Sequence, residues 1–378
     1  MPNPAPTKPD TAPRDLTSYV DPSVRAVPSR PSVRIAGTSF VLRPRMIIVS
    51  TLLAVMIVLL MGINIGRGDF PLSLPDVARV ILGGGDRLEQ FIVMDLRLPR
   101  SLVGVVVGFA LGLAGAITQS LTRNGLASPD ILGISAGASV TAVAVIVLTG
   151  GSTGVVLTAL GSVGLPLAAL FGGLVTAIVL YALAWKGGVD GFRLILIGIA
   201  ITAICQALVY WMLIKSDIND VAQAQAWLVG SLNGRDWRHF VPMLAATAAF
   251  GGIALAAASS VNVLRLGDET ARALGARVNG TQAVLLLSAV GLAAASVAAA
   301  GPIAFVGLMA PQMALRLLRA PGPPLLASGL VGAVLLLGAD ITARTMLPVE
   351  LPAGIVTAAI GGPFLLYLLV RTNRKVTA

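Results

Sequence analysis

Long apolar stretches recur along almost the whole chain and leave few folds open to it. Hydrophobic residues make up 56% of its 378 residues and charged residues only 12%, with a mean hydropathy of +0.88. A soluble domain carries about 25% charged residues. Stretches of about 17 to 25 apolar residues are long enough to cross the hydrocarbon core as helices, whereas transmembrane strands alternate apolar and polar residues. The sequence therefore predicts an all-α, polytopic membrane protein.

We expect about ten membrane-spanning helices. Their expected ranges are 46–65, 101–121, 131–149, 161–185, 193–214, 239–258, 281–300, 303–318, 324–343 and 354–370. The segment 154–185 can also be divided differently. Residues 1–44 are rich in Pro, Ser and Arg and poor in large apolar residues, which predicts a disordered basic tail. The transmembrane domain is then expected to cover residues 45–378.

The distribution of positive charge predicts the orientation in the membrane. With the N-terminus inside, 18 of the 27 Lys and Arg residues fall in cytoplasmic segments, as expected from the excess of positive charge in cytoplasmic loops. Both termini are thus expected in the cytoplasm. The net charge of +10 lies in loops between apolar spans, so topology explains it better than a nucleic-acid partner does.

Several classes of function are disfavoured by what the sequence lacks. Cys205 is the only cysteine and His239 the only histidine, so an internal disulfide and a metal cage are both excluded. None of the lysines lies in the G-x-x-x-x-G-K-[ST] loop of a P-loop ATPase. No two carboxylates face each other at mid-membrane in the predicted spans, which argues against an ion-coupled carrier. We predict no catalytic residue, no metal site and no cofactor.

Two segments have the same internal order. Residues 101–149 give a long Gly/Ala-rich helix, a sharp turn and a short Gly-rich helix, and residues 281–318 repeat this order on the opposite side of the bilayer. Inverted repeats with interrupted helices are common in transporters, where the interruptions line the substrate route. Single Gly and Ala residues can also serve only close helix packing. The paired interruptions favour the transport interpretation.

These segments resemble a known family. The stretch RLPRSLVGVVVGFALGLAGAITQSLTRNGLASPDILGISAGA (97–138), the loop LGDETARALG (266–275) and ELPAGIVTAAIGGPFL (350–365) are similar to FecCD-type permease subunits of ABC importers for iron-siderophores and cobalamin. The resemblance covers nearly the whole chain after Arg43. It implies the type II ABC importer permease architecture, with about ten transmembrane helices in an inverted repeat and no enzymatic activity of its own.

The resemblance also implies partners and a cargo. The partners would be a second permease subunit, identical or homologous, two copies of a cytoplasmic ABC ATPase, and an extracytoplasmic substrate-binding protein. The cargo would be a ferric siderophore, and the wording SLNGR at 231–235 is most similar to catecholate (enterobactin-type) permeases. Cobalamin and haem stay open as alternatives, and an ion-coupled secondary transporter is less favoured.

Three arginines lie on the outer side, where the charge bias disfavours them. Arg97 and Arg100 flank Pro99, and Arg344 precedes the last span. Such residues can anchor a helix end at the interface by snorkelling, or they can pair with carboxylates of a partner. The family resemblance implies that all three receive acidic residues of the binding protein. Asp340 is expected to pair with Arg344, four residues further on.

The cytoplasmic loop at about 260–280 is the second candidate site. Asp268 and Glu269 are placed to start a short helix, and Gly275 suits its C-terminal cap. Its apolar side chains fit either a membrane surface or a groove on a partner. The resemblance implies that it couples to the ATPase subunit. The residues predicted for this role are Leu264, Leu266, Gly267, Asp268, Glu269, Arg272, Leu274 and Gly275.

A third set of residues is predicted to line or gate the translocation pathway. The set consists of Gln119, Asn124, Gly125, Gly301, Pro302, Phe305 and Pro311. For Gln119, a hydrogen bond between helices is an equally open role. Two positions depart from the family pattern, since Gly125 stands where the family usually has proline and Gln312 where it usually has histidine. Either departure can alter gating.

Overall fold

The structure is a computed structural model that describes residues 32–35, 38–41, 44–68, 70–148, 164–185, 190–346 and 349–376. The chain divides into two units, residues 1–44 and 45–378. In the first unit, β1 (Ser32–Ile35) and β2 (Thr38–Val41) form an antiparallel pair. The rest of the predicted tail lies outside the described residues, so its disorder stays a prediction.

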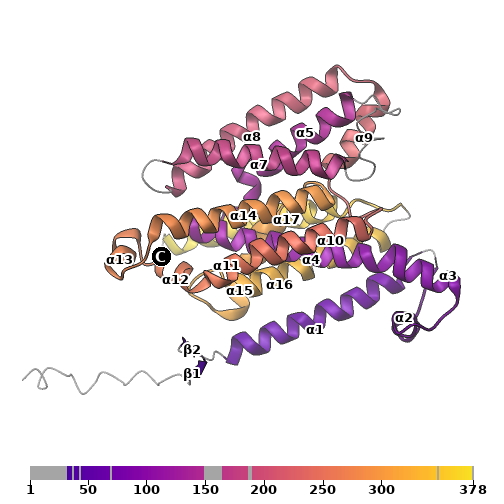
Figure 1. Ribbon diagram of the computed structural model, residues 1–378, viewed down its shortest axis with the longest axis horizontal. Helices are drawn as coiled ribbons and strands as arrows, with labels where there is room; N and C mark the ends of the chain where they lie inside the picture. Colours follow the sequence, from indigo (N-terminus) through magenta and orange to yellow (C-terminus); the bar gives the residue numbers. More distant parts are fainter. Residues whose placement is uncertain are drawn as a thin grey trace, which may run out of the picture. The chain divides into compact units, whose positions relative to one another are not determined.

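The second unit is built of helices (Figure 1). In the described part of the chain, eight helical segments are long and apolar enough to cross a membrane. They are α1 (Pro44–Gly66), the continuous helix Arg87–Leu121, α7 (Gly164–Ala184), α8 (Gly191–Ile214), the segment Trp237–Ala256, α14 (Val278–Ala300), α16 (Leu325–Thr345) and α17 (Ala353–Val376). Two shorter apolar helices, α5 (Ile134–Leu148) and α15 (Val306–Leu318), complete the set. The prediction of an all-α, polytopic membrane protein is confirmed.

Shorter elements join these helices. The helix Arg87–Leu121 consists of α3 (Arg87–Gln90), the π-helical η2 (Phe91–Arg97) and α4 (Leu98–Leu121), and Trp237–Ala256 consists of α10 (Trp237–Ala246), the π-helical η5 (Thr247–Gly251) and α11 (Gly252–Ala256). The connections contain α2 (Leu74–Ile81), the 3₁₀-helical η3 (Pro129–Leu132), α9 (Ile218–Leu228), α12 (Ala258–Leu264) and α13 (Asp268–Ala273).

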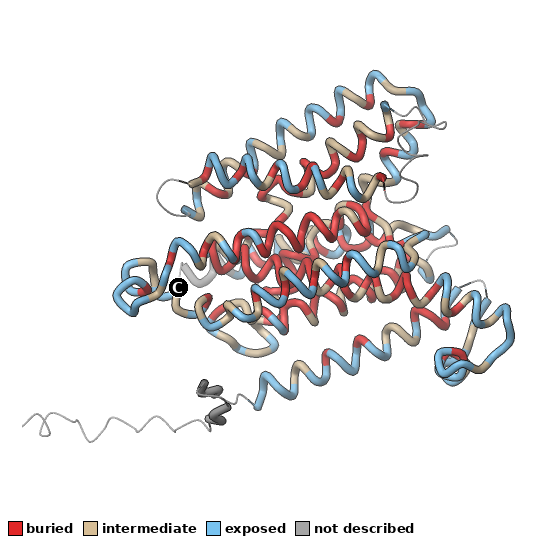
Figure 2. Tube along the Cα trace, viewed as in Figure 1, coloured by how far each residue is buried: buried red, intermediate tan, exposed pale blue. Residues whose placement is uncertain are grey.

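The buried core lies around α4 and α14, whereas α1 and α8 expose most of their apolar side chains (Figure 2). Helix α4 packs against α14, α15 and α16. At Gly112 the backbone of α16 lies so close that a Cβ would overlap the Ser328 carbonyl oxygen, and at Gly115 it would overlap the Gly307 carbonyl oxygen of α15. Small residues allow such close approach of membrane helices. For these glycines the packing role is the one that the structure shows.

The predicted span 101–121 begins too late. Its helix starts at Arg87, and the seven residues before α4 form the π-helical turn η2. Pro99 lacks an N–H and its ring crowds the carbonyl of Asp95 four residues earlier. A wide π-turn accommodates such an interruption without ending the helix. Proline is common at helix starts, but here the helix continues through Pro99.

Each half of the unit contains a long helix, an irregular break and a short helix. In the first half these are α4, residues 122–133 and α5, and in the second half they are α14, residues 301–305 and α15. The second break holds Gly301 at φ 75° and Phe305 at φ 67°, so α15 begins at Val306 rather than at the predicted residue 303. The two breaks leave the ends of four helices close to irregular backbone, as transporter pathways require.

Candidate functional site

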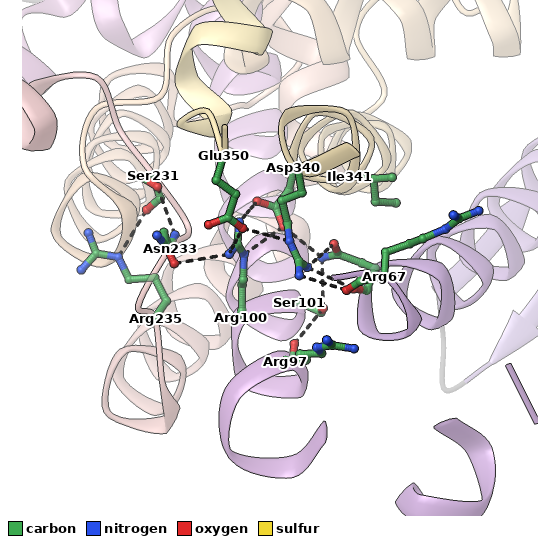
Figure 3. A network of polar contacts seen from close by, with 12 residues as sticks. Arg67, Arg97, Arg100, Ser101, Ser231, Asn233, Arg235, Asp340, Ile341 and Glu350 are labelled. Atoms are coloured by element: carbon green, nitrogen blue, oxygen red, sulfur yellow. Dashed lines mark hydrogen bonds and ion pairs between the residues drawn. The ribbon is translucent and has the colours of Figure 1, made fainter. Parts of the chain in front are cut away.

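A network of charged side chains covers the end of α4 where Arg97 and Arg100 lie (Figure 3). Arg100 donates to Asp340 of α16 through two nitrogens, with Nη2 to Oδ1 at 2.8 Å and Nε to Oδ2 at 3.2 Å. Its Nη1 lies 3.1 Å from Oε1 of Glu350. Arg344 reaches the same Oε1 through Nε, also at 3.1 Å. One carboxylate oxygen is therefore shared by two guanidinium groups.

Helix α1 closes this network from the other side. Asn64 donates through Nδ2 to Asp340 Oδ2 at 3.0 Å and to Ser101 Oγ at 3.1 Å. Arg344 donates to the backbone oxygen of Asn64 at 3.1 Å, and Arg97 donates to the backbone oxygen of Ile65 at 2.8 Å. The network joins α1, α4 and α16 to the segment that leads into α17. Hydrogen-bonded networks of this kind fix the relative positions of the elements that contribute to them.

The expected pair between Asp340 and Arg344 is wrong. Asp340 is fully buried and faces α4, where the planar guanidinium of Arg100 supplies two parallel donors. Arg344 lies one turn further on and contacts Glu350 and the backbone of α1 instead. The spacing of four residues puts the two groups on one helix face, but tertiary contacts on that face offer each a better partner.

The three arginines predicted for docking are brought together. Arg97 and Arg344 both lie against Gly68, and Arg344 shares Glu350 with Arg100. The side chains of Arg100 and Arg344 are only 10% and 11% exposed. The sequence predictions omit Ser101, Asn233 and Glu350, which complete the network. Asn233, at 3.4 Å from Arg100 Nη1, lies within the SLNGR motif, so the motif itself carried the signal.

The loop predicted to be cytoplasmic contains the short helix that the sequence predicts. Helix α13 begins at Asp268 and ends in a Schellman motif, in which Gly275 N donates to Arg272 O and Ala276 N to Ala271 O, with Gly275 at φ 81°. Leu266 and Leu274 are 60% and 64% exposed, whereas Leu264 is buried in the core. The loop thus exposes two of its predicted leucines and buries the third in the core.

Two arginines connect this loop to its neighbours. Arg123, in the turn after α4, pairs with Asp268 and donates to the backbone oxygen of Leu264 at 3.2 Å. Arg265 donates to Ser120 Oγ at 3.2 Å and to the backbone oxygen of Pro323 at 2.6 Å. Because burial disfavours its charge, the pKa of Arg265 is lowered. The sequence predictions include neither arginine, although Arg265 lies inside the analysed loop.

The turn after α4 contacts α15 through the two positions that depart from the family pattern. Gln312 Nε2 donates to Gly125 O at 3.0 Å and to Gln119 Oε1 at 2.9 Å. Gln119 in turn donates to the backbone oxygen of Leu308 at 3.2 Å and is buried. Asn124 Oδ1 accepts from Leu126 N at 2.9 Å and shapes the turn. Of the two roles open for Gln119, the structure shows the hydrogen bond between helices.

The second break lies beside a polar cavity. The cavity has a volume of about 460 Å³, and its lining comes from η3, α5, α8, α9 and the second break. Its polar lining includes Asp130, Ser135, Gln206, Tyr210 and Gln225, and Pro302 is also part of it. Phe305 lies against Gly361 of α17, and Pro311 is buried inside α15. Isolated polar residues in apolar spans, such as Gln206, were the sequence signal for this cavity.

In the described part of the chain, no group of three or more His, Cys, Asp and Glu side chains could hold a metal ion. The helical architecture has a match among solved structures of membrane transporters. A solved structure of a metal-chelate type ABC transporter in an inward-facing conformation matches this chain with a TM-score of 0.74 and 28% identity, over 87% of this chain and 100% of that chain.

The model of the FecCD transport family matches residues 52–371. The chain belongs to the FecCD transport family. It is therefore a multi-pass permease of an ABC importer for metal chelates or siderophores, and a transport component rather than an enzyme. The family predicted from the sequence is confirmed.

Relatives with different cargoes resemble the chain to a similar degree. The ferric enterobactin transport system permease protein FepG of Escherichia coli (strain K12) is 37% identical, and the iron(3+)-hydroxamate import system permease protein FhuG of Bacillus subtilis (strain 168) is 38% identical. Each comparison covers 88% of this chain and 98% of the relative. The Fe(3+)-citrate import system permease protein YfmE of Bacillus subtilis (strain 168) is 40% identical over 86% of this chain and 95% of the relative.

Proposed function

We propose that the chain carries a ferric siderophore of the catecholate type inward across the plasma membrane of a bacterium, with both termini in the cytoplasm. The observation that carries the proposed docking roles is the pair of charged elements at opposite ends of α4, one suited to an acidic partner and the other to an apolar groove. Its partners would be a second permease subunit, identical or homologous, two copies of a cytoplasmic ATPase and an extracytoplasmic substrate-binding protein. Cobalamin and haem are the alternative cargoes.

The outer network supports docking of the binding protein. Arg97, Arg100 and Arg344 gather within one network, and guanidinium groups bind carboxylates through parallel hydrogen bonds. The inner loop supports docking of the ATPase, because Leu266 and Leu274 stand exposed beside α13. Exposed leucines on a short helix suit a groove in a partner protein.

The pathway would run along the cavity bordered by Pro302. Asn124, Gly125, Gly301 and Phe305 lie in the two breaks, where irregular backbone can change shape more readily than a regular helix. ATP-driven closure of the ATPase subunits would pull on the loop 266–275 and tilt the two halves in opposite directions. The cavity would then open to one side of the membrane at a time.

The cargo rests on the SLNGR motif, and one competition experiment tests it. The permease would be purified with its ATPase and binding protein and reconstituted into liposomes that contain ATP. Uptake of radiolabelled iron bound to a tricatecholate, a trihydroxamate or citrate would be compared with uptake of labelled cobalamin and haem. ATP-dependent uptake of the tricatecholate above all others is expected. Preferential uptake of any other chelate would refute the catecholate assignment and leave the family membership intact.

A further inference from the structure

The two carboxylates of the outer network differ in a way that points to different roles. Asp340 is 1% exposed in its side chain and holds Arg100 with both oxygens. Glu350 is 41% exposed, and its contacts with the described residues all pass through Oε1, which touches Arg100 and Arg344. The first carboxylate is a fixed part of the helix packing. The second lies at the surface and bridges the two arginines from outside.

Glu350 therefore occupies the position that a partner's carboxylate would need. Arg100 and Arg344 are nearly buried, so an acidic side chain arriving from outside meets their donors where Glu350 now lies. We propose that Glu350 is an exchangeable stand-in, which an acidic side chain of the substrate-binding protein displaces from Arg100 and Arg344 during docking. The proposal rests on the docking role given above to the arginines and adds the residue that competes for them.

Exchange would be physically favourable because little has to be rebuilt. Asp340 keeps the guanidinium of Arg100 oriented through its two hydrogen bonds while the third donor changes partner. The incoming carboxylate offers the same charge and the same acceptor geometry. The released Glu350 is already part-exposed and regains water. Because Glu350 is 41% exposed, water competes for its carboxylate, and its ion pairs exchange more readily than the buried pair of Arg100 with Asp340.

The displaced side chain belongs to the segment that starts α17. Leu351 N donates to Ala343 O at 3.1 Å, and Gly354 N donates to Gly230 O at 3.1 Å. Gly230 in turn lies against the carbonyl oxygen of Pro302, at the edge of the polar cavity. Release of Glu350 would loosen one of the contacts that fix this segment. Docking at the outer surface would thereby loosen contacts of the residues that line the proposed pathway.

The test is an affinity measurement on the complete importer in lipid nanodiscs. Its own binding protein, with and without chelate, is titrated against the wild type, Glu350→Gln and Glu350→Asp. Glu350→Gln removes the competing charge while its amide oxygen still accepts one hydrogen bond. We expect this variant to bind about twofold to fivefold more tightly. Glu350→Asp keeps the charge but shortens the reach, so a smaller gain is expected.

The matched control is Asp76→Asn, because it also removes one negative charge from the same side of the membrane. Asp76 pairs with Arg79 away from the network, so binding should stay unchanged. Tighter binding in this control equal to that of Glu350→Gln would overturn the proposal in favour of a general charge effect. Unchanged or weaker binding by a folded Glu350→Gln would overturn it as well. If that variant does not assemble, weaker binding by Glu350→Asp has the same meaning.

Arg100→Gln and Arg344→Gln separate this inference from the docking role itself. Both should weaken binding by about tenfold or more. If they do and Glu350→Gln does not tighten binding, the exchange fails and the docking role stands. If neither arginine matters for binding, the docking role fails first.

Discussion

The two charged ends of α4 are built differently. At the end predicted to face outward (the outer end), Arg100 is nearly buried and uses three donors, and its partner Asp340 is almost inaccessible. At the end predicted to face the cytoplasm (the inner end), Arg123 and Asp268 form an ion pair whose side chains are 50% and 32% exposed. A buried ion pair is costly to break because the remaining charge is left without a partner, whereas an exposed pair contributes little. The ion pair at the outer end is thus costly to break, whereas the ion pair at the inner end can break at low cost.

This difference fits the work that each end would do. A binding protein must meet the same arrangement of arginines at every docking event, which requires a preorganised surface. A loop that follows the ATPase must move relative to α4, which requires contacts that break at low cost. The comparison also predicts which substitutions will damage the fold and which will damage only coupling.

The largest effect is expected from Asp340→Ala. Arg100 would lose its bidentate partner inside the protein, and Asn64 would lose one of its two acceptors. Removing one member of a buried pair costs about 3–5 kcal/mol, so the free energy of unfolding should fall by about that amount. Denaturant titration of the purified permease in detergent measures it. Asp76→Asn serves as the control. If Asp340→Ala lowers the free energy of unfolding by less than about 1 kcal/mol, the buried ion pair does not hold the outer end together.

At the inner end, the exposed leucines separate binding from folding. Leu274→Asp places a charge on an exposed position, so the permease should remain folded but bind its ATPase about tenfold or more weakly. Leu264→Asp places the same charge in the core and should prevent folding. Co-purification of the ATPase and the melting temperature of the permease distinguish the two outcomes. If Leu274→Asp binds the ATPase as the wild type does, the loop is not its docking element.

A smaller effect on stability is expected when the Arg123–Asp268 ion pair is broken. Arg123→Ala and Asp268→Asn should each change the free energy of unfolding by less than about 1 kcal/mol. Both should nevertheless lower the amount of chelate carried per ATP hydrolysed, since they break the contact between the loop and the turn after α4. The charge-reversed double variant Arg123→Asp/Asp268→Arg should recover part of that ratio. If the double variant recovers none of that ratio, the Arg123–Asp268 pair does not transmit movement.

Much of the fold could be predicted because a membrane-spanning helix is recognisable from one continuous stretch of sequence. About twenty mostly apolar residues suffice to identify a span, and in the described part of the chain each of the ten expected ranges overlaps an apolar helix. The boundary at Arg97–Arg100 was missed because proline is usual at helix starts, and only tertiary packing tells a start from a π-turn. The short helix 268–273 was predicted correctly because its cap depends on neighbouring residues alone.

Partners across the fold were less accessible to prediction. Asp340 was assigned to Arg344 because both lie on one helix, yet its true partner Arg100 is 240 residues away in the chain. Glu350 was recognised as part of a motif but not as the bridge between two arginines. The contact between Gly125 and Gln312 also joins residues far apart in the sequence, 187 positions from each other. Each residue was noted as a departure from the family pattern, and only the structure shows that the two departures touch.

Breaking the contact between Gly125 and Gln312 is expected to have the smallest effect. This hydrogen bond is uncharged and lies at the inner end, beside the Arg123–Asp268 ion pair. A Cβ at residue 125 would lie 2.8 Å from Gln312 Nε2, so Gly125→Pro should push the Gln312 amide away and break its hydrogen bond. Gln312→Ala removes the same bond from the other side. Because both variants break one interaction, their effects on uptake should not add, and the double variant should transport about as well as the weaker single variant.

The double-mutant cycle measures uptake rates in liposomes for the four proteins. Gln119→Ala supplies the reference, because Gln119 shares Gln312 but does not touch Gly125 in the described contacts. We expect an interaction free energy of about 0.5–1 kcal/mol between positions 125 and 312. Strict additivity would instead mean that the turn after α4 and α15 act independently. The inner end would then be joined to the rest of the protein through the Arg123–Asp268 pair and the contacts of Arg265.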